Sequence, residues 1–422
     1  MNINKNVCIC VFALLLCGLC TIQAQGNKTA FHYPDFNGKV MAGYQGWFNT
    51  STDGASRGWH HYERRGRFAP GSSEIDYWPD MREYKKKYNT NFHTKDGQMA
   101  TVFSSYDPST VNLHFKWMKQ YGVDGVFMQR FVAEIRNQSG QQHFNQVLSS
   151  AMKASRKYNR DICIMYDLSG MHPGEENLLI KDLDRLTKQY GLLETNGKTT
   201  PNYLHYRNKP LIAIWGVGFN DHRAYGFKEV KVIIDALKKR GFSILLGVPT
   251  YWRDFGSDAV KDPKLHELIL EGDIVAPWLV GRYNQQSYPK IEKSIQADIA
   301  WCKAHKIGYV PLAFPGFSWK NMNGPRSTEI SRNRGAFFWQ QIAGAKNLGA
   351  TMLYIAMFDE MNEGTSIFKV ATKSKVPKNA EGYFHGIDDD LGSDYYLWLT
   401  GQASRWFKGH TGYSDQLPVR KK

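Results

Sequence analysis

The sequence predicts an α/β protein, a (β/α)8 TIM barrel with elaborated βα loops. Two observations lead to this fold class. Eight apolar segments of strand length recur along the chain, and amphipathic helical stretches separate most of them. A strand followed by a helix, repeated eight times, is typical of a barrel with parallel strands inside and helices outside. The 422 residues are long for one domain, but such barrels reach this length when their loops are enlarged, and no linker divides the chain.

The eight strand candidates are near-continuous apolar runs, as expected for strands that are buried on both faces. They are Lys39–Phe48, Gly122–Phe131, Asp161–Leu168, Pro210–Val217, Phe242–Pro249, Asp273–Val280, Gly308–Phe314 and Ala350–Phe358.

Capping residues mark several of the expected helices. Asp107 precedes a helical stretch as an N-terminal cap, whereas Gly241 and Gly349 follow the ends of two others. The helices expected from these signals and from apolar periodicity are 108–121, 142–158, 175–190, 227–239, 288–305 and 330–347.

The first 24 residues have the pattern of a secretory signal peptide. Lys5 precedes an apolar run from Val7 to Cys20, and Ala24 supplies the small residue before the expected cleavage site. This run is too short to span a bilayer, and no later segment is apolar enough, so we expect no stable membrane insertion. We therefore expect a secreted or periplasmic protein with one domain over residues 25–422.

Cysteine and charge content exclude several other classes of protein. Four of the six cysteines lie in the leader, which leaves Cys163 and Cys302, both expected to be buried and free. The formal net charge is +15, which is compatible with an anionic glycan, a nucleic acid or an acidic surface. No nucleic-acid-binding motif accompanies this charge, so no nucleic-acid partner is expected.

Aromatic and polar residues gather where the expected strands end, which is where barrel enzymes hold their active sites. Aromatic rings stack on sugar rings, and amide, imidazole and hydroxyl groups bind sugar hydroxyls, so the pattern predicts a carbohydrate cleft. The expected substrate-binding residues are Trp47, Asn49, His60, Gln129, Tyr166, Trp252, Tyr283, Phe317 and Trp319.

Two glutamates follow the last strand candidate. Glu360 and Glu363 are three residues apart, so they would point in opposite directions if the strand continued. A bend near Met361, with Gly364 after it, would bring both carboxyl groups into one pocket, where burial and like charge separate their pKa values. We therefore expect Glu360 and Glu363 to be the catalytic acid/base pair.

Other chemistries lack their signatures in the sequence. His60 and His61 are adjacent, and on an extended chain their side chains would diverge, so no metal site is expected. There is no dinucleotide-binding fingerprint, phosphate-binding loop or nucleophilic-serine elbow. We therefore expect no cofactor.

These residues together resemble glycoside hydrolase family 99, the endo-α-mannosidases, and more loosely the family 71 α-1,3-glucanases. The likeness spans most of the chain beyond the leader. The most specific match is the segment from Phe358 to Thr365, which is similar to the family's asparagine-glutamate-x-x-glutamate-glycine-threonine motif, with Asp359 in place of the usual asparagine. Further matches are Trp47 to Asn49, Tyr77 to Tyr84, Ser104 to Pro108, Pro315 to Phe317 and Arg332 to Gly335.

The resemblance implies a glycoside hydrolase that cleaves α-mannosidic bonds within chains and retains the anomeric configuration. Glu360 would remove the proton of the sugar's 2-hydroxyl, which attacks the anomeric carbon, and Glu363 would protonate the leaving oxygen. The alternatives are the same scaffold acting on an α-glucan or on xylan or arabinan side chains, and a non-catalytic glycan-binding barrel.

Overall fold

The computed structural model describes residues 34–193, 200–378, 384–410 and 412–421. The described residues form one compact unit. The predicted leader, residues 1–24, lies outside the described residues.

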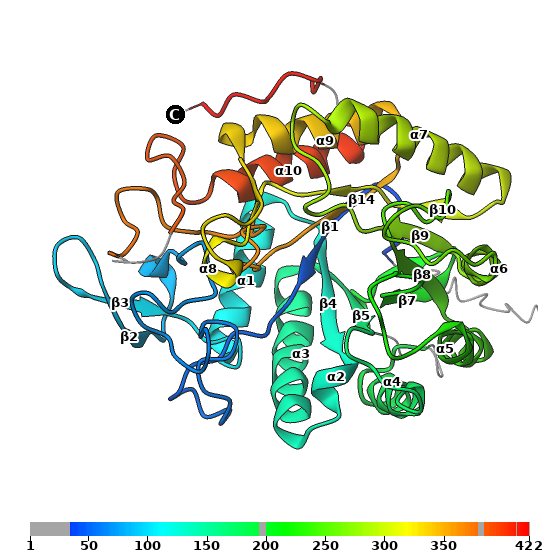
Figure 1. The fold of residues 1–422 in the computed structure, drawn as a ribbon, viewed down its shortest axis with the longest axis horizontal. Helices are drawn as coiled ribbons and strands as arrows, with labels where there is room; N and C mark the ends of the chain where they lie inside the picture. The colour runs from blue at the N-terminus through cyan, green and yellow to red at the C-terminus, as the bar shows by residue number, and fades with distance from the viewer. Residues whose placement is uncertain (1–33, 194–199, 379–383, 411, 422) are drawn as a thin grey trace, which may run out of the picture. The chain divides into compact units, whose positions relative to one another are not determined.

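The central feature is a curled parallel sheet (Figure 1). Neighbouring strands follow the order β10-β9-β8-β7-β5-β4-β1-β14-β11, and all of these pairs are parallel. Their bounds are β1 (Lys39–Tyr44), β4 (Gly125–Phe131), β5 (Asp161–Asp167), β7 (Lys209–Trp215), β8 (Ser243–Val248), β9 (Ile274–Pro277), β10 (Gly308–Tyr309), β11 (Leu312–Ala313) and β14 (Met352–Ile355).

The sheet closes into a barrel through its seventh strand, which a proline interrupts. The two halves, β10 and β11, pair with β9 and β14 respectively. Between them, the Val310 N–H donates to Val275 O at 2.8 Å, and Pro311 O accepts from the Tyr354 N–H at 3.0 Å. Pro311 itself has no N–H to donate. These contacts link the sixth and eighth barrel strands and confirm the predicted (β/α)8 fold.

Helices surround the strands (Figure 1). The Asp107 cap is confirmed, because its carboxylate accepts from Ser109 N at 2.8 Å. The predicted helix from residue 330 is wrong at its start, because Glu329–Ile330 form a short strand, β13, and the helix begins at Ala336. The long helices are α1 (Pro108–Tyr121), α3 (Gln138–Tyr158), α4 (Glu176–Tyr190), α5 (Phe227–Arg240), α6 (Lys264–Glu271), α7 (Tyr288–Ala304), α9 (Ala336–Asn347) and α10 (Tyr395–Phe407).

The shorter elements lie mostly in the loops that follow the strands. A hairpin pairs β2 and β3, β12 pairs β13, and β6 adds to the edge of β7. Their bounds are β2 (Tyr88–His93), β3 (Met99–Val102), β6 (His205–Tyr206), β12 (Phe317–Ser318), α2 (Val132–Ile135) and α8 (Lys320–Asn323).

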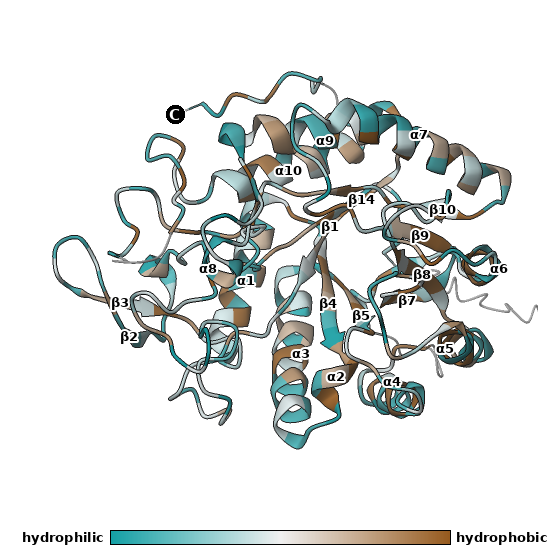
Figure 2. Ribbon diagram, in the orientation of Figure 1, coloured by the Kyte–Doolittle hydropathy of each residue, from teal (hydrophilic) through white to brown (hydrophobic). Residues whose placement is uncertain are grey.

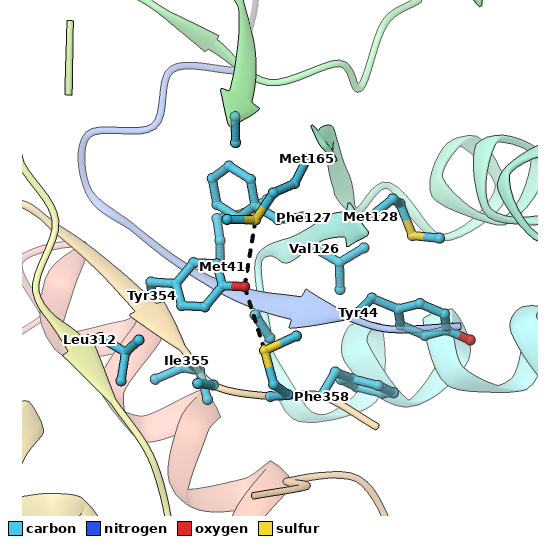
Figure 3. Packing of buried hydrophobic residues seen from close by; sticks show 14 of the residues in the cluster. Met41, Tyr44, Val126, Phe127, Met128, Met165, Leu312, Tyr354, Ile355 and Phe358 are labelled. Carbon is cyan, nitrogen blue, oxygen red and sulfur yellow. Dashed lines mark hydrogen bonds between the residues drawn. The ribbon is translucent and has the colours of Figure 1, made fainter. Parts of the chain in front are cut away.

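The barrel strands are the most hydrophobic part of the fold, and the helices carry polar residues on their outer sides (Figure 2). Inside the barrel, the Tyr354 hydroxyl points between the sulfur atoms of Met165 and Met357, at 3.8 and 3.5 Å (Figure 3). Gly43 leaves the space for this ring, since a Cβ there would lie 2.2 Å from the Tyr354 hydroxyl. The barrel interior is therefore filled by side chains.

Two further expectations concern cysteines and membrane spans. Cys163 and Cys302 are both buried and free, as predicted. Among the described residues, no helix combines the length and the hydropathy that crossing a bilayer requires.

We expect Gly401→Ala to destabilise the protein. Gly401 lies inside α10, and a Cβ at this position would lie 1.7 Å from the Tyr121 carbonyl oxygen at the end of α1. The two helices would have to separate, which costs about 1–3 kcal/mol. Urea unfolding measures this loss, with the exposed Arg405→Ala on the same helix as the control. An equal free energy of unfolding for both variants would contradict the close packing of α10 on α1.

Candidate active site

The two predicted catalytic glutamates lie in the loop that follows β14. The chain reverses direction there: Ser366 N donates to Glu360 O at 2.9 Å, and Gly364 N donates to Met361 O at 3.3 Å. Gly364 has φ of +67°, a conformation that favours glycine. The predicted bend near Met361 is confirmed.

Asp359 fastens this loop to the first strand. Its carboxylate accepts from Gln45 N at 2.7 Å and from Gly46 N at 2.9 Å, directly after β1. The side chain of Gln45 then donates to Glu360 Oε2 at 2.8 Å. Gln45 therefore makes two contacts with this loop. Its backbone N–H binds Asp359, and its side chain binds the candidate catalytic residue Glu360.

A cavity of about 350 Å³ opens at the C-terminal ends of the strands, and both glutamates line it. Gln45 and Gln129 lie beside them on the wall. One group of wall residues follows β1 and β4: Trp47, His61, Phe131, Ala133 and Glu134. A second group follows β5, β7 and β9: Asp167, Ser169, Trp215 and Trp278.

Burial and mutual repulsion shape the charge of the glutamate pair. Burial raises the pKa of Glu360 well above its ordinary value, and the nearby Glu363 raises it further, whereas the hydrogen bond from Gln45 opposes the shift. Burial raises the pKa of Glu363 to about 7, although the Trp319 indole favours the ionised form. The pair therefore retains a proton close to neutral pH, as an acid/base pair requires.

Two further carboxylates line the same cavity. Burial raises the pKa of Asp167, which accepts a hydrogen bond from Ser169 N at 2.7 Å. For Glu134, burial is outweighed by His60 and Arg57, and the net pKa is lowered; Arg57 Nη2 lies 2.5 Å from its Oε2. No lysine or arginine within the described ranges lines this cavity. The cleft is therefore acidic although the chain is basic.

Aromatic rings form much of the wall. Trp47 stacks against His61 with ring centroids 3.8 Å apart, and against Phe131 at 5.2 Å. Trp215 meets Trp278 edge to face at 5.5 Å. Within the described part of the chain, the indole N–H groups of Trp47 and Trp215 have no protein acceptor. A bound sugar can offer its hydroxyl oxygens to such groups.

His60, His61 and Glu134 form a cluster at one edge of the cavity. His61 has φ of +60°, so the chain is not extended there, and the expectation that the two imidazoles diverge is wrong. The ligand-type atoms of the three residues lie within 4.8 Å of one another. However, Glu134 is already neutralised by its ion pair with Arg57, whose positive charge beside the cluster disfavours a bound cation. We therefore interpret the cluster as a salt-bridged part of the wall.

The predicted site residues fall into three groups. The structure brings Trp47, Gln129, Glu360 and Glu363 together around the cavity. His60 lies behind the wall, with Nε2 3.3 Å from Glu134 Oε1. Trp319 is half-buried beside Glu363.

The other five predicted substrate-binding residues are buried elsewhere, which corrects the sequence-based assignment. The Tyr166 hydroxyl donates to Asp182 of α4, so this side chain faces the helices. Asn49 donates to Asp53, and the Tyr283 hydroxyl donates to Gln341. Trp252 packs against Trp301 with no exposed surface, and Phe317 is buried against Trp319.

The neighbours of some misassigned residues are the ones that line the cavity. Side chains alternate along a strand, so Met165 and Asp167 face inward where Tyr166 faces outward. The ends of the predicted strands already contained four residues of the cavity wall, Asp167, Phe131, Trp215 and Trp278. Their position at a strand end was the sequence signal that could have identified them. Glu134 was missed because it lies in α2, which begins directly after β4, whereas the first helix expected after that strand began at residue 142.

A (β/α)8 barrel with paired carboxylates and aromatic walls at the C-terminal ends of its strands has the architecture of a glycoside hydrolase. Comparisons with known proteins agree. The chain is similar to the glycoprotein endo-alpha-1,2-mannosidase of Mus musculus, with 19% identity over 389 residues that cover 86% of this chain and 74% of the relative. The enzyme of the same name from Rattus norvegicus is 20% identical over 356 residues, which cover 81% and 70%. No protein-family model matches the chain.

Solved structures share the fold. The family 99 endo-alpha-mannosidase of Bacteroides thetaiotaomicron superposes with a TM-score of 0.64 at 17% identity, covering 88% of this chain and 98% of the other. The same enzyme in complex with bis-tris propane gives 0.62 at 16% identity and the same coverage. The barrel fold is therefore common to this chain and that enzyme.

Alanine variants of two tryptophans should distinguish a ligand-binding residue from a core-packing residue. We expect Trp47→Ala to weaken about tenfold the binding of the oligosaccharide that the wild type binds, because it removes a stacking surface of the cleft. Trp252→Ala should instead cost about 3–5 kcal/mol of stability through the cavity it leaves. Titration calorimetry and urea unfolding of both variants measure the two effects. Unaltered binding by Trp47→Ala would remove this residue from the site.

Proposed function

We propose that the protein is a secreted glycoside hydrolase that cleaves α-mannosidic bonds within glycan chains. Glu360 and Glu363, which line one cavity together and both have raised pKa values, are the observation that carries this proposal. A module that only binds glycans gains nothing from two repelling carboxylates. The similarity to enzymes named endo-alpha-mannosidases supplies the bond type.

The two glutamates take different roles in the proposed reaction. Glu363 protonates the glycosidic oxygen as the bond to the anomeric carbon breaks. Glu360 accepts the proton of the substrate's own 2-hydroxyl, whose oxygen forms the new bond to that carbon. Water, deprotonated by Glu363, then opens the resulting 1,2-anhydro sugar, and the 2-hydroxyl recovers its proton from Glu360. The anomeric configuration is retained, and both carboxyl groups end as they began.

The position of the shared proton changes when substrate binds. In the free protein the pKa of Glu360 is raised strongly, which favours its neutral form, whereas Glu363 titrates at about 7. A sugar hydroxyl that donates to Glu360 adds a second hydrogen bond beside that of Gln45 and stabilises the carboxylate. Substrate binding thus favours ionised Glu360 and protonated Glu363.

Secretion is part of the proposal because of the leader pattern between Lys5 and Ala24. Amino-terminal sequencing of protein exported by its natural host would show a start at Gln25. The reaction is tested by incubating purified protein with α-mannans, α-glucans and arabinoxylans and identifying the products. Release of internal oligosaccharides from an α-mannan alone supports the proposal, and release only from another polymer would replace its substrate.

We expect Glu363→Gln to lower kcat about 10²–10⁴-fold on natural substrates, because the amide cannot donate the proton. Binding of oligosaccharide, measured by calorimetry, should persist. Glu292→Gln, on the outer helix α7, is the matched control and should retain full activity. Wild-type turnover by Glu363→Gln would assign the acid to another residue.

A 2-fluoro substrate distinguishes the proposed mechanism from a covalent one. Without a 2-hydroxyl there is no internal nucleophile, so we expect no turnover and no added mass on the protein. A conventional retaining enzyme would accumulate a glycosyl ester on its carboxylate nucleophile. Intact-protein mass spectrometry after incubation reads this directly. An adduct located on Glu360 would overturn the neighbouring-group mechanism.

A further inference from the structure

A short segment after the seventh barrel strand supports the candidate acid. Ser318 ends β12, Trp319 follows, and Lys320–Asn323 form α8. The Ser318 N–H donates to Glu363 O at 2.9 Å. The Trp319 indole lies close enough to Glu363 to lower its pKa, and its N–H makes no hydrogen bond of ordinary geometry in the described part of the chain.

Asp76 holds this segment from the opposite side. It is fully buried, with 0% exposure. Its Oδ1 accepts from Asn321 N at 2.8 Å, and its Oδ2 accepts from Lys320 N at 2.8 Å and from the Ser318 hydroxyl. These three donors flank Trp319 on both sides.

The same residue is also tied to the loop of the glutamates. Asp76 N donates to Met361 O at 3.0 Å, two residues before Glu363. The side chain of Asn321 donates to Ile75 O at 2.7 Å, which adds a second link between α8 and the segment of Asp76. Three pieces of chain that are far apart in sequence therefore meet at Asp76, one through its carboxylate and one through its backbone N–H.

We propose that Asp76 is a positioning residue that holds the segment with Trp319 against the loop that carries Glu363. This inference rests on the proposed function of Glu363. Asp76 does not line the cavity, so it acts only through the segment that it holds. The contact with Trp319 stabilises ionised Glu363, and its loss would make the acid harder to deprotonate.

The surroundings of Asp76 fit this role better than a nucleophilic serine site. The Ser318 oxygen also lies 3.3 Å from His385 Nε2, but Ser318 donates its proton to Asp76. Burial raises the pKa of Asp76 to about 6, opposed by its three hydrogen bonds and raised further by Glu329. Glu329 is itself paired with Lys320 and approached by His385. Asp76 is therefore ionised above pH 6 and serves as an acceptor.

Asparagine cannot replace Asp76. Each carboxylate oxygen receives a backbone N–H, so either orientation of an amide would turn an NH₂ group toward a buried donor. Ser318→Ala is the milder change, because it removes the hydroxyl and keeps both backbone donors. Asp76→Asn should therefore disturb the segment more than Ser318→Ala.

The first test needs no substrate. Hydrogen exchange of the 317–323 peptide in the full chain should speed up about tenfold or more in Asp76→Asn and less in Ser318→Ala. A crystal structure of Asp76→Asn should show Trp319 displaced from Glu363. Asp124→Asn is the matched control: Asp124 is also buried and accepts from Val40 N and the Ser404 hydroxyl, at the other end of the barrel. Unchanged exchange in Asp76→Asn would overturn the inference.

The second test is the pH profile of kcat/KM on the substrate that the wild type cleaves. The acid limb of the wild type should lie near pH 7, because the pair carries two protons below that pH and reaches the singly protonated form that the reaction requires as Glu363 titrates. In Asp76→Asn it should move up by about 0.5–1 pH unit, with kcat/KM about tenfold lower. Trp319→Phe should produce the same shift, the double variant no more than either, and Asp124→Asn none.

The outcomes are separable. Faster exchange without a shift of the limb, or fully additive shifts in the double variant, would reduce Asp76 to a structural residue and overturn the proposal. If Asp76→Asn does not fold, Ser318→Ala takes its place. A shift of the limb in Ser318→Ala that adds nothing to the shift of Trp319→Phe supports the proposal, and the absence of a shift overturns it. A wild type without any hydrolytic activity defeats the proposed function, while exchange and the crystal structure still decide whether Asp76 places Trp319.

Discussion

The buried carboxylate of Asp359 is the contact on which the site depends. A barrel brings the ends of its first and last strands together, but it does not fix the loops beyond them. Asp359 does so by accepting the backbone N–H groups of Gln45 and Gly46, and it thereby aims the Gln45 amide at Glu360. Burial raises the pKa of Asp359 to about 7 against the effect of these two donors. Each oxygen of Asp359 accepts one of these N–H groups, so the end of the first strand is held by two acceptors.

Charge is distributed unevenly between the cleft and the rest of the protein. The chain carries a formal +15, yet four carboxylates line a cavity of about 350 Å³. Removing ionised groups from water is costly. The structure limits the cost differently at each position: Arg57 neutralises Glu134, a backbone N–H stabilises Asp167, and the glutamate pair retains a proton. The surplus of positive charge lies outside this cavity, where it bears on solubility and encounter more than on the reacting sugar.

The apolar strand segments and the helix caps predicted the barrel, and the strand ends predicted the face of the barrel that carries the site. It was harder to predict which side chains of each strand point into the barrel. Tyr166 and Asp167 are both plausible sugar ligands by type, and only the inward side of the strand selects Asp167. Trp252 illustrates a second limit, because its burial against Trp301 depends on a helix about fifty residues further along the chain. The cluster around Glu134 required the left-handed backbone of His61, which the histidine pair does not reveal.

Weak sequence identity and a shared fold are compatible because different parts of the chain are constrained differently. At 16–17% identity to the solved structures, most of the sequence has changed while the barrel architecture remains. What a reaction on one glycosidic bond requires is local: two carboxyl groups whose proton affinities differ and whose positions are fixed. Here that requirement is met by three segments that are distant in sequence. The first strand supplies Gln45, the segment before the β2–β3 hairpin supplies Asp76, and the seventh strand leads to Trp319. Gln45 acts on Glu360, Trp319 acts on Glu363, and Asp76 holds the segment of Trp319. The different roles of two chemically identical side chains therefore depend on the different residues that contact them.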